Sequence, residues 1–93
     1  MFAHAAAIKS YLAPLVALEV GQQVLCQAGF QIFDPLQPGK ITVGGEHPSG
    51  VLVTVVSIDC EGGSATVINA FSPNDAASAQ QMMMTVYQTI QSS

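Results

Sequence analysis

Charged residues are scarce in this sequence, and arginine and tryptophan do not occur in it. Only 9% of its 93 residues are charged, against roughly 25% in an ordinary domain. Lys9 and Lys40 are the only lysines, and six acidic residues bring the formal net charge to -4. Proteins that bind nucleic acid or anionic membranes need clustered basic side chains. The composition therefore predicts a protein that binds neither.

Cysteine is also scarce, and no long apolar run is present. Two cysteines, Cys26 and Cys60, are too few for a disulfide framework, which favours a reduced, cytoplasmic protein. The apolar stretch at 11–20 contains Pro14 and Glu19 and is shorter than the ~20 residues that cross a bilayer. The N-terminal segment lacks the basic region of a signal peptide. We therefore expect a cytoplasmic protein without a membrane segment.

The sequence contains no recognisable catalytic or metal-binding motif. Glu46 and His47 are adjacent in a predicted loop, but neighbouring loop side chains need not converge on a substrate. Cys60 stands between two acidic residues, which disfavours a reactive thiolate. His4, His47 and Cys60 lack the spacing of a zinc site. We expect neither an enzyme nor a metal or other cofactor, and His47 is the first residue to mutate if that expectation is wrong.

The alanine-rich N-terminal part of the chain predicts helix. Residues 3–28 contain strong helix formers and apolar residues spaced three or four apart. Pro14 disfavours helix at Ala13, so the segment is either one kinked helix or two helices that meet there. In the second case Pro14 suits the first turn of the second helix. Gly29 is a natural end for the helix.

Strand-like segments fill the middle of the chain. Turn residues separate four of them, at 30–33, 40–43, 51–58 and 64–71. The last two form a predicted hairpin in which both faces are mainly apolar. A pairing of Ile58 with Ser64 is assumed for its register, and a slip of one residue would exchange the faces.

The last segment predicts an amphipathic helix. Ser72 is its expected N-cap, followed by Pro73 at the first helical position. A buried stripe of Ala76, Ala79, Met83, Val86 and Ile90 is expected, with Tyr87 beside it and with Met82 and Met84 on its flanks. Residues 1–93 thus predict a single α+β domain. Its expected architecture is a two-layer sandwich, with an antiparallel meander of three or four strands and one helical segment at each end.

Two functional hypotheses follow from these patterns. The first is a non-enzymatic interaction or assembly module, a homo-oligomer and most simply a dimer, joined through an apolar sheet face, the methionine-bearing helix, or both. Its interaction residues would be Met82, Met83, Met84 and Tyr87, because three consecutive residues span about 200° of a helix. The alternative is a small apolar-ligand-binding protein with a pocket between helix and sheet. Its polar anchors would be Ser57, Asn69 and Tyr87.

Overall fold

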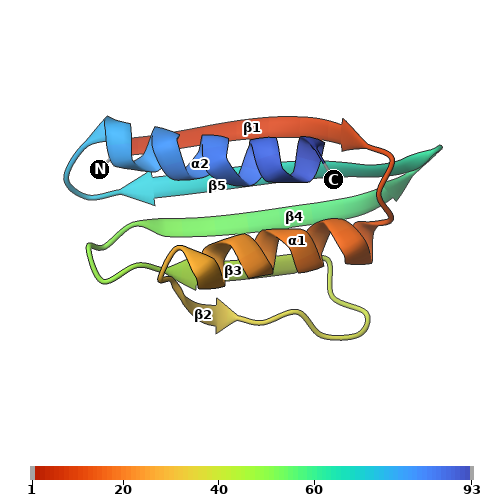
Figure 1. The fold of residues 1–93 in the computed structure, drawn as a ribbon, viewed down its shortest axis with the longest axis horizontal. Coiled ribbons are helices and arrows are strands. Elements are labelled where there is room, and N and C mark those ends of the chain that lie inside the picture. Colours follow the sequence, from red (N-terminus) through yellow and green to blue (C-terminus); the bar gives the residue numbers. More distant parts are fainter. Residues whose placement is uncertain (1, 93) are drawn as a thin grey trace.

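The computed structural model describes residues 2–92, which form a five-stranded antiparallel sheet and two helices (Figure 1). The elements follow in the order β1 (Phe2–Ser10), α1 (Pro14–Gln27), β2 (Gln31–Asp34), β3 (Thr42–Glu46), β4 (Leu52–Cys60), β5 (Gly63–Ser72) and α2 (Ala76–Gln91). The α+β class and the terminal position of the second helix agree with the sequence. The sheet has five strands, whereas three or four were predicted.

The strands lie in the order β1-β5-β4-β3-β2. The four strands from β2 to β5 form the predicted meander, since each pairs antiparallel with the next along the chain. β1 adds to the far side of β5, from Phe2 opposite Ser72 to Ser10 opposite Ser64. The first strand of the sequence therefore becomes one edge of the sheet, and β2 becomes the other edge.

The N-terminal segment is a strand where the sequence predicted helix. Residues 2–10 pair with β5, so the helix predicted before Pro14 is wrong, and the helical part of the 3–28 segment is α1 (Pro14–Gln27). Alanine's helix propensity is a weak preference, and pairing with β5 outweighs it. Pro14 does occupy the first turn of α1, after an extended Ala13.

α1 ends at the predicted glycine. Gly29 has a φ of 88°, and its N–H donates to the carbonyl of Cys26 at 3.2 Å. The N–H of Phe30 donates to the carbonyl of Leu25 at 2.9 Å. These two bonds form a Schellman motif, which turns the chain out of α1 toward β2.

The β4–β5 hairpin is tighter than the sequence predicted. Its connection is the two-residue turn 61–62, and Gly62 supplies a φ of 85°. Ile58 lies opposite Ala65, one residue away from the assumed partner Ser64. The slip exchanges the face of every β5 side chain relative to β4. Both faces of the hairpin are nevertheless rich in apolar residues.

α2 begins later than predicted because its cap is a different residue. The Asp75 carboxylate accepts the N–H of Ser78 at 2.6 Å, which makes Asp75 the N-cap in place of Ser72. The Ser72 hydroxyl instead accepts the N–H groups of Asn74 and Asp75, both at 3.3 Å, and so orders the turn before the helix. The predicted stripe is otherwise correct, since its buried residues are Ala79, Met83, Val86 and Ile90.

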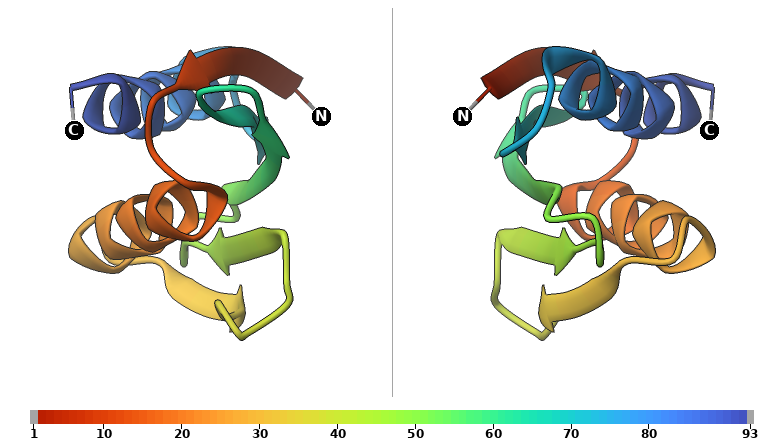
Figure 2. Two further views of the ribbon diagram at one scale, coloured as in Figure 1. Left: turned by 90° about the vertical axis from the view of Figure 1, so that its right-hand side faces the viewer. Right: turned by 90° about the vertical axis from the view of Figure 1, so that its left-hand side faces the viewer.

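Both helices pack on the same face of the sheet (Figure 2). α1 covers β3 and β4, and α2 covers β1 and β5. Gly21 permits the close approach of α1, because a Cβ there would lie 3.3 Å from the Val55 side chain. The core lies between this helical layer and the sheet and is centred on Leu18, Leu25, Val43, Val53, Val55, Ile68, Val86 and Ile90.

Candidate functional site: the open sheet face

Within the described residues 2–92, no helix covers the opposite face of the sheet, and this uncovered surface is the candidate site. Side chains alternate along each strand, so every second residue points away from the helices. We call the outward-pointing set the open face. It consists of Ala3, Ala5, Ala7 and Lys9 on β1, Ala65, Val67, Asn69 and Phe71 on β5, Leu52, Thr54, Val56 and Ile58 on β4, Thr42, Gly44 and Glu46 on β3, and Phe33 on β2.

The centre of the open face is uncharged and largely apolar. None of its β4 and β5 residues is ionisable. Ile58 is 50% exposed, Val67 38% and Phe33 56%. Single exposed apolar side chains are ordinary, whereas neighbouring ones that form a patch are typical of interaction sites. The centre of the face can exclude water against another apolar surface, and its ionisable residues, Lys9 and Glu46, lie at the ends of their strands.

Gly44 extends the open face toward β2. The strand predicted at 40–43 ends before Gly44 and Gly45, yet both glycines lie within β3. Phe33 covers the first of them, because a Cβ on Gly44 would lie 2.9 Å from the Phe33 ring. Gly44 thus gives an aromatic ring a flat place to lie. Phe33 is not among the residues predicted to be functional, because the sequence of its strand alone does not show which face it occupies.

A shallow hollow crosses the open face where β1 meets β5. Its volume is about 400 Å³. From the open face of β1 it is lined by Lys9 and by Ala7, whose small side chain leaves the space unfilled. It is lined by Ala7, Ile8, Lys9, Cys60, Ala65, Thr66 and Val67.

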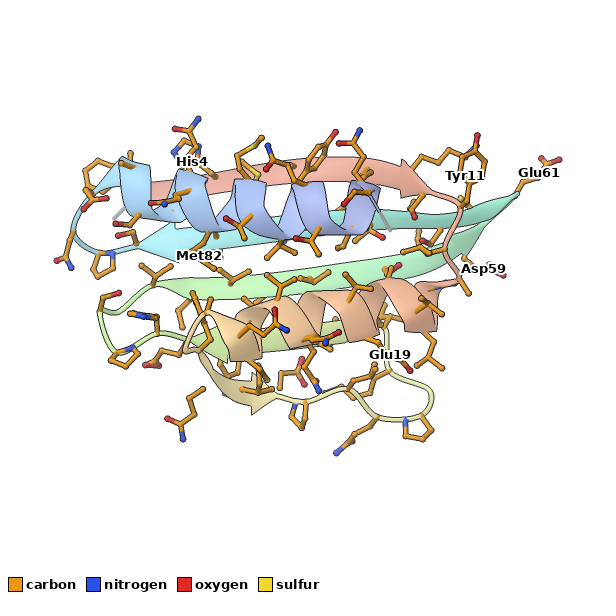
Figure 3. The ribbon with its side chains drawn as sticks, viewed as in Figure 1. His4, Tyr11, Glu19, Asp59, Glu61 and Met82 are labelled. Carbon is orange, nitrogen blue, oxygen red and sulfur yellow. The ribbon has the colours of Figure 1, made fainter. Side chains whose placement is uncertain are left out.

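The three methionines of α2 have three different environments. Met83 is only 7% exposed and belongs to the core. Met82 lies on the side of α2 that faces α1, where it lines a pocket of about 160 Å³ with Ala28 and Phe30 (Figure 3). Met84 is 37% exposed. Since Met84 is 200° around the helix from Met82, it lies on the other flank, toward β1.

The predicted ligand anchors do not converge. Ser57 is fully buried on the helical side of the sheet, where its hydroxyl is 3.0 Å from that of Thr66. Asn69 lies on the open face opposite Thr54. Tyr87 is partly buried on α2 against the core. Because Ser57 and Asn69 point to opposite faces, the three side chains do not line one pocket.

The remaining candidates for chemistry lie apart. The Nδ1 atom of His47 accepts the N–H of Ser49 at 3.1 Å, and the His47 ring packs 5.2 Å from Phe30. Within residues 2–92, no three His, Cys, Asp or Glu side chains form a group that could hold a metal ion. Cys26 and Cys60 are free thiols.

Two aspartates have lowered pKa values for local reasons. Hydrogen bonds from Lys40 and then from Thr42 lower the pKa of Asp34, and Lys40 also pairs with it as an ion. The N–H of Ser78 lowers the pKa of Asp75. Both groups fasten loops, at the β2–β3 connection and at the start of α2. Asp75 lies away from the open face, and Asp34 binds Thr42 at the edge of that face.

No protein-family model matches the sequence, and no curated protein matches it. In the described part of the chain, neither helix has the length and apolar character of a membrane span.

Proposed function

We propose that the protein is a non-enzymatic assembly module that associates with copies of itself through the open face. The observation that carries this proposal is the position of the two helices, which cover one face of an apolar sheet and leave the other bare. Burial of apolar surface stabilises by about 25 cal/mol per Å². A second chain that covers this face would therefore bury apolar surface and stabilise the assembly, as a third layer of secondary structure does in larger domains.

The few charges of the chain fit a second copy as the occupant. With a formal net charge of -4, two copies repel each other weakly. Lys9, at the end of β1, and Glu46, at the end of β3, stand at diagonally opposite corners of the open face. A half-turn about an axis along the other diagonal would bring Lys9 of each copy against Glu46 of the other. The face is thus self-complementary in charge and apolar at its centre.

Val67→Lys tests the open face. Val67 lies near the centre of that face on β5, so a lysine there would put a charge into the interface at no cost to the core. We expect the association to weaken at least tenfold, while the free energy of unfolding changes by no more than about 1 kcal/mol. Sedimentation velocity measures the first quantity and urea denaturation the second.

Gln23→Lys is the matched control. Gln23 is exposed on α1, so this variant adds the same charge on the opposite side of the molecule. Its sedimentation should equal that of the wild type. If Val67→Lys and Gln23→Lys associate equally well, the open face is not the interface and the proposal fails.

A further inference from the structure

The two edges of the sheet differ in how well they are protected from pairing with another chain. β2 has four residues, a shift in its register between Ile32 and Asp34, and Pro35 directly after it. Shortness, bulges and proline are the usual means of blunting an edge strand. β1 has nine residues, a continuous register and no proline, and its one charged residue is Lys9 near its end. Only β2 is built as a protected edge.

The hydrogen-bond directions identify the free groups of β1. The N–H of Ser57 donates to Ile41, and that of His47 to the carbonyl of Val51, so odd-numbered residues of β4 face β3. Partners alternate along an antiparallel strand. The backbone groups of even-numbered β4 residues therefore bond to β5, where their partners are odd-numbered. Even-numbered β5 residues then bond to even-numbered β1 residues. The N–H and C=O groups that point out of the sheet are those of Ala3, Ala5, Ala7 and Lys9.

We propose that β1 pairs edge to edge with β1 of a second copy, antiparallel, about a two-fold axis at Ala6. In this register Ala3 lies opposite the second copy's Lys9, and Ala5 opposite its Ala7. Every outward N–H and C=O of the strand then has a partner, and two five-stranded sheets become one of ten strands. The two Lys9 side chains lie about 20 Å apart at 3.4 Å per residue, so no like charges meet.

The same axis brings the two α2 helices together. α2 lies over β1 and β5, and a half-turn about an axis perpendicular to the sheet leaves both copies of α2 on the same side. With strands about 4.8 Å apart, the two helix axes would lie about 10 Å apart, a normal packing distance. The two helices would face each other with the flank that lies opposite Met82. This flank carries Met84 and Tyr87. The partly exposed Met84 would be covered there by its own copy.

This edge contact does not depend on the open face, and either contact can form without the other. Ala5→Pro tests it. The substitution removes an N–H that the sheet does not use, and proline is tolerated on edge strands. We expect the fold to be retained by circular dichroism, while the mass of the assembly falls. Ala5→Ser keeps the N–H and is the control that should retain the wild-type mass.

Met84→Lys tests the helical half of the contact. It should lower the mass of the assembly as Ala5→Pro does, because it places a charge between the two α2 helices. Gln81→Lys puts the same charge on the flank that lines the pocket with Met82 and should leave the mass unchanged. Wild-type mass in both Ala5→Pro and Met84→Lys would overturn the edge contact, even if Val67→Lys still weakens association.

Amide hydrogen exchange gives a readout that does not depend on any variant. Above the concentration at which the chain associates, the N–H groups of Ala3, Ala5, Ala7 and Lys9 should exchange slowly. On dilution they should exchange at least tenfold faster, while those of Ala6 and Ile8 stay protected by β5. Fast exchange at all four odd positions in the associated protein would overturn the proposal.

Discussion

The three methionines at 82–84 should contribute differently to the free energy of unfolding, because each points in a different direction around α2. Met83 lies within the core, so Met83→Ala should lower the free energy of unfolding by about 2–5 kcal/mol. Met84→Ala removes a partly exposed side chain and should cost less than about 1 kcal/mol. Urea denaturation at equal protein concentration measures both values. Equal losses in the two variants would contradict the assignment of Met83 to the core.

The corner charges of the open face allow a test by charge reversal. Lys9→Glu and Glu46→Lys should each weaken association, because each would set like charges against one another between copies. The double variant, with both reversals, restores opposite charges and should recover most of the wild-type affinity. Sedimentation at low salt maximises the effect, since exposed pairs are screened. A double variant that associates more weakly than both single variants would contradict the diagonal two-fold arrangement.

The Asp75 cap predicts how acid affects the protein. Its pKa in the folded chain is lowered by the N–H of Ser78. The stability it contributes is therefore complete above the ordinary aspartate pKa of about 4 and is lost as the pH falls through the lowered value. Asparagine also caps helices but does not titrate. Asp75→Asn should thus lose less stability than the wild type below about pH 4, and identical thermal unfolding curves in acid would contradict this.

At the scale of elements, the sequence predicts best where a local signal and the fold agree. α2 and the β4–β5 hairpin follow from periodicity and β-branched residues, and the end of α1 follows from Gly29. The start of α2 is less certain because Ser72 and Asp75 are both good caps. Ser72 lies three residues before the observed N-cap, in the turn that precedes the helix. The hydrogen bond from the N–H of Ser78 identifies Asp75 as the cap.

β1 is the element that the sequence could not predict. Its alanines favour helix in isolation, and its period-two pattern is weak because Ala5 and Ala7 have the same small side chain as Ala6. The strand exists because β5 supplies nine pairing partners far away in the sequence. Long-range pairing of this kind leaves no local signal. The same alanines make β1 a flat edge, which the proposed edge contact uses.

At the scale of the whole molecule, the arrangement of layers determines the candidate site. The sequence showed that both faces of the hairpin are apolar but not which face the helices cover. That depends on both helices packing on one side, a property of the topology rather than of any segment. Of the four residues predicted for interaction, Met83 lies within the core, and Met82 and Tyr87 are partly buried against it. Their role between copies stays a prediction.

The two proposed contacts have two-fold axes at right angles to each other. The axis of the open-face contact lies parallel to the sheet, and that of the β1 edge contact is perpendicular to it. A chain that uses both forms assemblies larger than a dimer, whereas loss of one contact leaves a dimer. Combining Val67→Lys with Ala5→Pro should leave a monomer. Each single variant should have the mass of a dimer and the double variant that of a monomer, so the three masses distinguish the two contacts.

The most direct test of self-association is the molar mass of the unmodified chain by light scattering at micromolar concentration. The open face predicts a mass of at least twice the 9.7 kDa of one chain, falling toward that of the monomer on dilution. A mass of 9.7 kDa at every concentration would contradict the account, because a fold with a bare apolar sheet face would then be stable and soluble alone.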